Sequence, residues 1–286
     1  MISKLFKKFY LAGLGLLLIC LQASAAKVDT VVTHSAAMNK DIKAVVISPA
    51  DYSKKEKYPV LYLLHGFSGN YSDWVKKVPD VVRLADQYHC LIVCPDGNFA
   101  SWYFDSPMSK EWQYETYVAN ELVSWIDHHY ATIADRSGRA ITGLSMGGHG
   151  ALYLAIRHQD TFGAAGSMSG CVDLVPFSKS FGISQVLGDY ESNPQRWKDN
   201  SVINMLDQLK PNSLSIIFDC GYSDGFYPSN MEMHNRLVKM KVPHDFIVRD
   251  GGHSWEYWGN SIVYQVLFFS RHLSGWETKK GLHATK

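Results

Sequence analysis

The feature that most restricts the fold of this chain is a regular alternation of short apolar runs with longer amphipathic segments. Short, nearly continuous apolar runs are typical of strands that are buried on both faces of a sheet. Strands that alternate with helices predict an α/β fold, in which helices cover both faces of a mostly parallel sheet. The expected strands are PVLYLLHG (Pro59–Gly66), CLIVCPDG (Cys90–Gly97), RAITGLS (Arg139–Ser145), FGAAGSMSG (Phe162–Gly170), LSIIFDCG (Leu214–Gly221) and HDFIVRDGG (His244–Gly252).

The segments between these runs repeat apolar residues at helical spacing, as Leu122 and Ile126 do. Ahead of the first parallel strand, residues 28–52 have the pattern of leading antiparallel strands. A length of 286 residues fits one large domain, so we expect residues 26–286 to form a single α/β domain. The expected helices span residues 81–89, 114–130, 146–158, 230–241 and 258–273.

One segment, residues 173–212, breaks the alternation. It separates two expected strands by more residues than a simple crossover needs, and long connections in compact domains often carry function. The segment is therefore either a small cap insertion over a site or an ordinary long connection with surface helices. The sequence pattern leaves both interpretations open.

Composition excludes several functional classes. The apolar share of 46% and the charged share of 19% indicate a globular chain with a sizeable core. The formal charge is +1 and no basic block occurs, so we expect no nucleic-acid partner. There is no C-x-x-C motif and no tight Cys/His cluster, so we expect no metal site and no cofactor. Beyond the N-terminal region four cysteines remain, and their pairing stays open between three disulfide patterns and free thiols. They are Cys90, Cys94, Cys171 and Cys220.

The N-terminus has the layout of a secretory signal peptide. Three lysines precede the apolar run of residues 11–21, and the small residues 23–26 follow it. The run is short for a membrane span, which needs about 20 residues. Bulky Ile19 before Cys20 argues against a lipoprotein site. We expect cleavage after Ala25 or Ala26, with residues 1–25 as the signal peptide, periplasmic or secreted localisation, and no stable membrane insertion afterwards.

A serine between glycines stands in the stretch ITGLSMGGHG, as Gly143-Leu144-Ser145-Met146-Gly147. A G-x-S-x-G match alone is weak, because turns collect both residue types. Here an expected strand precedes the motif and an expected helix follows it, which is the context of a nucleophile elbow. No G-K-[ST] or G-x-G-x-x-G follows the strand, which argues against a phosphate-binding loop. The pattern predicts that Ser145 is a nucleophile.

A serine hydroxyl needs a base to take its proton. His253 stands in the loop DGGHSW after the last expected strand, where it can reach over the carboxyl edge of the sheet. His149 lies along the helix that follows Ser145, and we interpret it as a packing residue.

An acid should orient the base and stand between the nucleophile and the base in the chain. Asp224 lies in the turn after the strand LSIIFDCG, so we favour it as the acid. Asp219 falls inside that strand and is interpreted as structural, and Asp173 is a third choice.

An oxyanion hole needs two backbone donors. One expected donor is the N–H of Met146, the residue after the nucleophile. The other expected donor is the N–H of Phe67, in the loop HGFSGN that follows an early strand. Aromatic residues also lie near the expected site loops and in residues 173–212. We consider Trp102 and Trp197 as substrate-contacting residues, against the alternative that these rings pack in the core.

These motifs resemble the esterase D / tributyrin esterase branch of the α/β-hydrolases. The branch includes bacterial feruloyl and acetyl esterases of carbohydrate esterase family 1 and, more distantly, the antigen 85 acyltransferases. The resemblance covers roughly residues 43–273. It departs at CGYSD, where relatives more often read Cys-Gly-Thr-Glu-Asp, although Asp224 still occupies the acid position. The matching stretches are YLLHGFSGNYSDW, GLSMGGHGALYLAIRHQDTFGAAGSMSG, DCGYSDGFYPSN and GGHSWEYW.

The resemblance implies an α/β-hydrolase fold and a serine esterase that acts through an acyl-enzyme, with Ser145, Asp224 and His253 as the triad. It implies short-chain or aromatic acyl esters, such as acetyl or feruloyl groups on polysaccharide, as substrates. An acyltransferase that uses the same triad stays open as an alternative. An S-formylglutathione hydrolase-like thioesterase fits the export signal less well. A non-catalytic binding protein is disfavoured because the three residues are all present.

Overall fold

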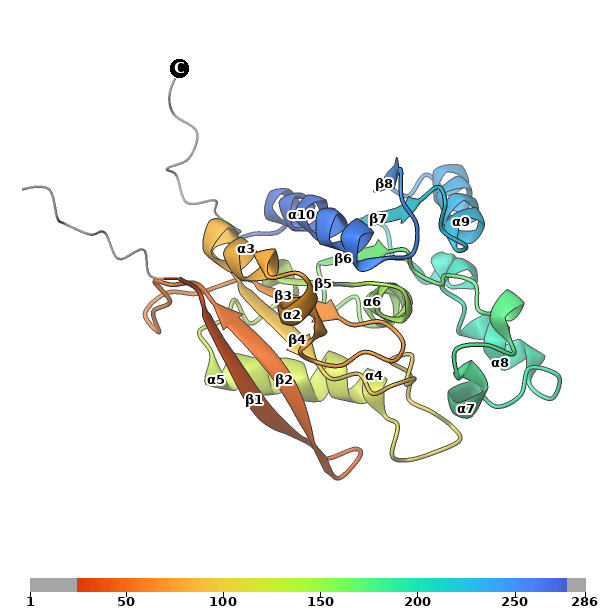
Figure 1. Ribbon diagram of the computed structural model, residues 1–286, viewed down its shortest axis with the longest axis horizontal. Helices are drawn as coiled ribbons and strands as arrows, with labels where there is room; N and C mark the ends of the chain where they lie inside the picture. Colours follow the sequence, from red (N-terminus) through yellow and green to blue (C-terminus); the bar gives the residue numbers. More distant parts are fainter. Residues whose placement is uncertain (1–24, 277–286) are drawn as a thin grey trace, which may run out of the picture.

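The computed structural model describes residues 25–276, and an eight-stranded sheet runs through the middle of the molecule (Figure 1). In spatial order the strands are β1 (Lys27–Ser35), β2 (Lys40–Ser48), β4 (Leu91–Pro95), β3 (Val60–Leu64), β5 (Arg139–Gly143), β6 (Ala164–Met168), β7 (Ser215–Gly221) and β8 (His244–Arg249). β2 pairs antiparallel with both β1 and β4, and the pairings from β4 through β3 to β8 are parallel. The predicted α/β fold is confirmed, including its leading antiparallel strands.

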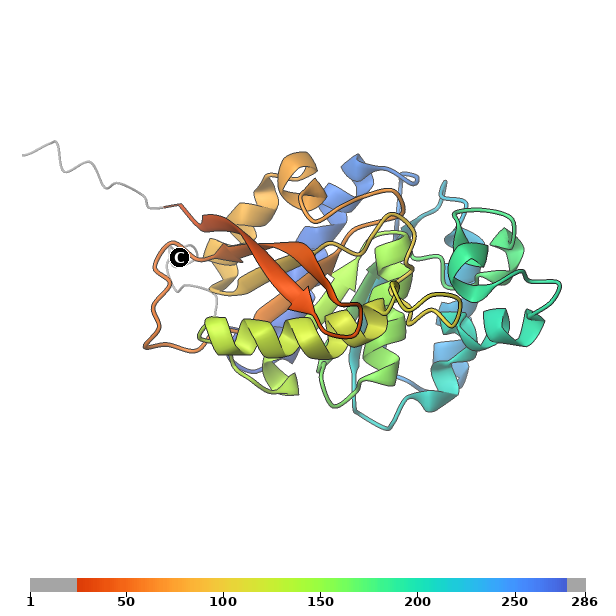
Figure 2. The same ribbon diagram turned by 90° about the horizontal axis from the view of Figure 1, so that it is seen from below.

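Helices cover both faces of this sheet. The α-helices of the described residues are α2 (Asp73–Lys77), α3 (Asp80–Tyr88), α4 (Tyr114–Thr116), α5 (Val123–His129), α6 (Met146–Arg157), α7 (Ile183–Leu187), α8 (Pro194–Asp199), α9 (Tyr227–Lys239) and α10 (Trp255–His272). α2, α3 and α10 contribute to one buried cluster, which includes Trp74, Leu84 and Phe269. α5, α6 and α9 contribute to a second cluster, which includes Ile126 and Leu154. Figure 1 shows α3 and α10 above the sheet and α5 below it, and Figure 2 shows α5 in front of the strands.

The central strands are buried throughout because both of their faces are covered. Every residue of β3, β4, β5 and β6 is buried. At the edge of the sheet, β8 has only intermediate and exposed residues. Parallel strands place their carboxyl ends at one edge of a sheet, where ligand sites of open α/β folds lie. The loops that follow β3, β5, β7 and β8 therefore emerge together.

The helix expected over residues 114–130 is not regular. Between α4 and α5, residues Tyr117–Leu122 form a π-helical stretch. The hydroxyl groups of Tyr117 and Thr33 hydrogen-bond at 2.7 Å, so the widened turn carries a buried contact to β1. The short helices α2, α7 and α8 were not predicted, because five or six residues are too few to display helical periodicity.

All four cysteines beyond the N-terminal region are buried and free. Within residues 25–276 the cysteines are therefore free thiols, and none of the three possible disulfide patterns is formed. Within the same residues, no helix has both the length and the apolar content to cross a membrane. The expected signal peptide, residues 1–25, lies outside the described residues except for Ala25.

A buried polar network ties α10 to the middle of the sheet. The Gln265 amide nitrogen donates to the Ser167 carbonyl oxygen at 2.9 Å and to Asp219 Oδ2 at 2.7 Å. The Thr142 hydroxyl donates to the Gln265 amide oxygen. Gln265 is fully buried and uses both ends of its amide. One side chain thus joins β5, β6 and β7 to the helix that covers them.

We predict that Gln265→Leu lowers the free energy of unfolding by about 1–3 kcal/mol, because it leaves buried polar partners without a hydrogen bond. Urea denaturation at neutral pH measures the change. Asn260→Leu is the matched control on the same helix, because Asn260 is exposed and surface substitutions usually stay within about 0.5 kcal/mol. Equal stabilities of the two variants would show that the network contributes nothing measurable.

Candidate active site

Ser145 lies in the tight turn between β5 and α6. Its backbone has φ 55° and ψ −117°, a conformation that a residue with a side chain rarely adopts. The turn also packs very closely on the end of β3. A Cβ atom on Gly147 would lie 2.5 Å from the carbonyl oxygen of His65, and one on Gly143 would lie 2.7 Å from Leu64 Cβ. Both flanking positions therefore require glycine.

The structure brings Ser145, His253 and Asp224 together from three loops. His253 Nε2 lies 2.8 Å from Ser145 Oγ, and His253 Nδ1 lies 2.8 Å from Asp224 Oδ2. Asp224 follows β7, and its other carboxylate oxygen accepts the N–H of Phe226 at 2.9 Å. His253 follows β8, just before the N-cap of α10. With a proton on Nδ1, the imidazole can accept the Ser145 proton at Nε2.

The surroundings keep Asp224 ionised. Its side chain is 1% exposed, and burial by itself raises the pKa of a carboxyl group. The hydrogen bond and charge of His253, together with the Phe226 N–H, outweigh burial and hold the pKa of Asp224 below its usual range. The His253 ring is also flanked edge-on by Phe226 at 5.0 Å and by Trp258 at 4.8 Å between ring centroids. The carboxylate and the two rings restrict how the imidazole can turn.

The two backbone donors expected for an oxyanion hole are free. Neither the Phe67 N–H nor the Met146 N–H donates a hydrogen bond to any residue in the range 25–276. Met146 is the first residue of α6, so its N–H belongs to the positive end of that helix. Phe67 lines the same cavity as Ser145. Both groups can therefore donate to an anion beside the serine.

The His65 side chain braces the loop that carries Phe67, a role that the sequence reasoning missed. Its Nδ1 lies 2.8 Å from the Gly66 carbonyl oxygen, and its Nε2 accepts the Gly97 N–H at 2.7 Å. These contacts require the neutral tautomer with the proton on Nδ1. Burial also lowers the pKa of His65. The ring thus joins the loops after β3 and β4. The stretch LLHG contains this histidine, but its partner lies 32 residues away.

A cavity of about 230 Å³ opens beside Ser145. Aromatic residues from three separate segments line it, and polar side chains from α2 and the preceding loop complete the lining. The aromatic lining residues are Phe67, Phe181, Trp255 and Trp258, and the polar ones include Ser68, Asp73 and Lys77. Phe181 comes from residues 173–212, so this segment contributes a side chain directly to the cavity. The sequence pattern did not identify Phe181 as that residue.

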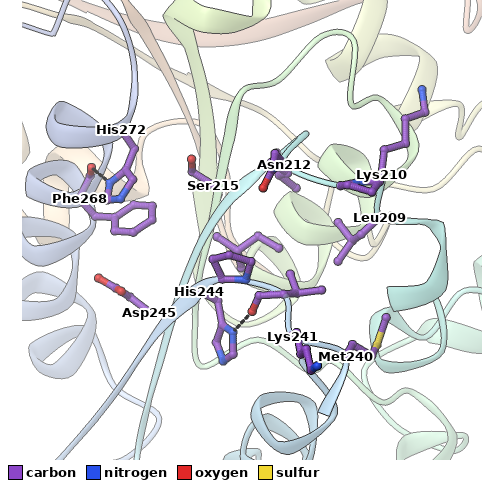
Figure 3. Close-up of a pocket in the computed structure, with 15 residues that line it drawn as sticks. Leu209, Lys210, Asn212, Ser215, Met240, Lys241, His244, Asp245, Phe268 and His272 are labelled. Carbon is purple, nitrogen blue, oxygen red and sulfur yellow. Dashed lines mark hydrogen bonds between the residues drawn. The ribbon is translucent and has the colours of Figure 1, made fainter. Parts of the chain in front are cut away.

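A larger cavity of about 470 Å³ lies where β7 and β8 begin, at the opposite edge of the sheet (Figure 3). Its two imidazoles hydrogen-bond to the backbone: His244 Nδ1 to the Val242 carbonyl and His272 Nδ1 to the Phe268 carbonyl, each at 2.8 Å. No serine hydroxyl in this cavity hydrogen-bonds to an imidazole in the described part of the chain. Size alone therefore does not identify the candidate active site. Of these two cavities, the smaller one is lined by a serine and an imidazole that lie within hydrogen-bond distance of each other.

The alternative acids have other partners. Asp219 is fully buried and accepts hydrogen bonds from the Ser261 hydroxyl at 2.6 Å and from Gln265, whereas the two ring nitrogens of His253 contact Asp224 and Ser145. Burial raises the pKa of Asp219 above its usual value, against these hydrogen bonds. Asp173 accepts the Val175 N–H at 3.1 Å. Both carboxylates are engaged in structural contacts, as the sequence position of Asp219 suggested.

The prediction that Trp102 and Trp197 contact substrate is wrong. Their exposed fractions are 1% and 0%, so both rings pack in the core. The Trp102 indole N–H donates to the Phe181 carbonyl oxygen at 3.0 Å, and the Trp197 indole N–H donates to the Gly188 carbonyl oxygen at 2.8 Å. Their positions in the sequence did not reveal that both rings turn inward. Among residues 25–276, no group of three or more His, Cys, Asp or Glu side chains is arranged to hold a metal ion.

Comparisons with known proteins identify the family of this chain. The Esterase family model matches residues 35–269. An acetyl esterase of Caldicellulosiruptor saccharolyticus is 27% identical over 258 residues, which cover 83% of this chain and 96% of that protein. The solved structure of a ferulic acid esterase is 32% identical, with a TM-score of 0.75 and coverage of 87% of this chain and 100% of that one. FphF, a fluorophosphonate-binding serine hydrolase of Staphylococcus aureus, shares the fold with a TM-score of 0.77, 20% identity and coverage of 86% and 98%.

His149, inside the serine motif, packs in the core, and its burial should make the stability of the protein depend on pH. The ring is fully buried between Trp102, Phe104 and Tyr153, and burial lowers its pKa from 6.5 to about 4. A neutral buried histidine contributes stability that is complete above pH 6.5 and is lost as the pH falls toward 4. The contribution of His149 to the free energy of unfolding should decrease by about 3 kcal/mol across this interval.

Urea denaturation between pH 7 and pH 4 measures this loss. The variant His149→Gln should have a flatter pH dependence than the wild type, whatever its stability at pH 7. His128→Gln is the control, because His128 is exposed, and it should keep the wild-type slope. An unchanged slope in His149→Gln would contradict the burial argument.

Proposed function

The chain belongs to the Esterase family and is a carboxylic-ester hydrolase, and from this premise we propose that Ser145, His253 and Asp224 are its catalytic triad. The observation that carries the proposal is the pair of 2.8 Å contacts that join His253 to the Ser145 hydroxyl and to the Asp224 carboxylate. A nucleophile, a base and an orienting acid within hydrogen-bond reach are what acyl transfer requires.

In the proposed reaction, His253 Nε2 takes the Ser145 proton as the serine oxygen attacks the ester carbonyl carbon. The carbonyl π electrons move onto oxygen, and the imidazolium that forms is stabilised by Asp224. Collapse of the tetrahedral intermediate expels the alcohol, which receives the proton from His253. Water then attacks the acyl-enzyme by the same steps and releases the acid. The lowered pKa of Asp224 suits this role, because the carboxylate stays ionised near neutral pH.

The oxyanion of each intermediate is proposed to accept the Phe67 and Met146 N–H groups. Two facts support this assignment: neither group donates to another described residue, and Met146 begins a helix. The strained turn places Ser145 immediately before the helix, so the N–H of the next residue stays at the helix start. Loss of one such donor typically costs about 2.7–4 kcal/mol of transition-state stabilisation.

The proposed substrates are esters of short-chain or aromatic acids, including acetyl or feruloyl groups carried by polysaccharide. The relatives named acetyl esterase and ferulic acid esterase support this class. The cavity beside Ser145 supports it as well, because about 230 Å³ is less than the volume that holds a drug-sized ligand. Its aromatic lining suits an acyl group, and Asp73 and Lys77 can hydrogen-bond to hydroxyl groups of a sugar.

Substitution of the triad tests the mechanism. Ser145→Ala should lower kcat for p-nitrophenyl acetate by roughly 10⁴–10⁶-fold, and Asp224→Asn should lower it by about 10⁴-fold, because the imidazole loses its orienting acid. Asp219→Asn should have a far smaller effect on kcat. Ser192→Ala, at an exposed position outside the site, is the control. Wild-type turnover by Ser145→Ala would refute the nucleophile assignment, and the reverse order of the two aspartate variants would identify Asp219 as the acid.

A substrate panel tests the proposed specificity. We expect kcat/KM to be highest for acetyl, butyryl or feruloyl esters, with acetylated xylan as the polymeric substrate, and to fall for long acyl chains that exceed the cavity. Preference for long-chain lipids would overturn this expectation. Product analysis with an added sugar acceptor distinguishes release of the free acid from transfer of the acyl group, which uses the same acyl-enzyme.

Export is the remaining part of the proposal. Three lysines, an apolar run and the small residues 23–26 support removal of residues 1–25 by a signal peptidase. Expression of the full chain in a bacterial host, followed by mass spectrometry of the periplasmic and extracellular fractions, should find a mature N-terminus at residue 26 or 27. An uncleaved chain in the cytoplasm would contradict export.

A further inference from the structure

The side chain of Phe181 forms part of the wall beside the proposed nucleophile. It lines the cavity that contains Ser145 and is 39% exposed. Its ring lies 5.8 Å from that of Phe67 and 6.2 Å from that of Phe226, measured between centroids. Phe226 in turn contacts the His253 ring. Residues 173–212 thus place one large aromatic side chain against the loops that carry the site.

The backbone at this position is held in an unfavourable conformation. Phe181 has φ 55° and Gly182 has φ 66°, so two successive residues adopt the left-handed region. A residue with a side chain populates this region reluctantly, and such strain persists only when the surroundings impose it. For Gly182 the conformation is inexpensive, but for Phe181 it is not. Something must therefore hold the Phe181 peptide in place.

The Trp102 indole supplies that restraint. Its N–H donates to the Phe181 carbonyl oxygen at 3.0 Å across 79 residues of sequence. Trp102 is itself 1% exposed and lies edge-on to the buried His149 ring at 5.6 Å. A donor anchored in the core therefore fixes a partly exposed phenylalanine at the cavity. The hydrogen bond thus fixes the position of a partly exposed side chain. Packing of the core does not require that side chain to be fixed.

We propose that Phe181 is a specificity-determining residue that limits the length of the acyl group beside Ser145, and that Trp102 is a positioning residue that fixes it there. This inference rests on the proposed function of the site. The acyl side is assigned because the Phe181 ring contacts the ring of Phe67, the proposed donor to the carbonyl oxygen, whereas the Phe226 ring lies between Phe181 and His253 in the chain of ring contacts. The His253 side chain is 35% exposed, so the alcohol that it protonates can leave toward solvent.

The experiment compares kcat/KM for p-nitrophenyl acetate and p-nitrophenyl octanoate. In Phe181→Ala, the ratio of octanoate to acetate should rise by about tenfold or more, which corresponds to burial of about two additional methylene groups in the enlarged cavity. A second series, in which the acetyl group is constant and the alcohol varies in size, should show no comparable change. Turnover of acetate itself should persist, because the triad is intact.

Trp102→Phe keeps an aromatic ring but removes the N–H donor. The same ratio should rise in this variant, by less than in Phe181→Ala, while kcat for acetate stays close to the wild-type value. A merely structural role for Trp102 would lower stability without altering the ratio. Phe99→Ala is the matched control. Phe99 is 58% exposed and also contacts the Phe67 ring, at 4.9 Å, but it does not line the cavity.

The outcomes separate this inference from the proposed function. If Phe181→Ala is active and keeps the wild-type ratio of kcat/KM for octanoate to acetate, the inference is overturned and the triad assignment is unaffected. A change confined to the series of different alcohols has the same two consequences. If Phe181→Ala does not fold, Phe181→Leu should shift the ratio in the same direction by a smaller factor, and an unchanged ratio in that folded variant overturns the inference. Full activity of Ser145→Ala would instead refute the proposed function.

Discussion

The close approach of the β5–α6 turn to the end of β3 is the constraint on which the proposed site depends. Side chains are excluded at Gly143 and Gly147 because backbone and Leu64 atoms of neighbouring segments lie within 2.7 Å of the positions their Cβ atoms would occupy. This packing forces Ser145 into a conformation that costs of the order of 1–3 kcal/mol. It also brings the start of α6 against the loop that carries Phe67, so the two free N–H groups belong to adjoining segments. The positions of the proposed nucleophile and of the two proposed anion donors follow from a single close contact.

A second close contact holds the loop of the proposed base. A Cβ atom on Gly221, at the end of β7, would lie 2.1 Å from the carbonyl oxygen of Gly251 in the loop before α10. Gly251 has φ 126°, a conformation that only glycine adopts readily. The loop that presents His253 therefore lies directly on the strand that leads to Asp224. Because α10 is tied to the sheet through Gln265, both ends of this loop are anchored.

Much of the architecture was accessible from the sequence because its signals are local. The six parallel strands begin and end within about three residues of their predicted positions, since continuous apolar runs report burial on both faces. The order Ser145, Asp224, His253 follows from where loops must emerge from a parallel sheet. The prediction that two tryptophans contact substrate failed because the direction of a side chain is not a local signal. Trp102 lies in a loop and Trp197 lies in the short helix α8, and nothing in a linear pattern tells whether such a side chain turns inward or outward.

The sequence by itself determined the α/β fold, the glycine-bounded serine turn and the three residues that meet there, because periodicity and turn chemistry act over a few residues. Only the tertiary structure decided what surrounds them. The His65 ring braces its loop through an amide 32 residues away, and Trp102 holds Phe181 across 79 residues. Such contacts depend on which loops the strand order brings side by side, and no local pattern encodes them. The proposed catalytic residues were therefore readable from the chain, whereas the shape of the cavity beside them was set by folding.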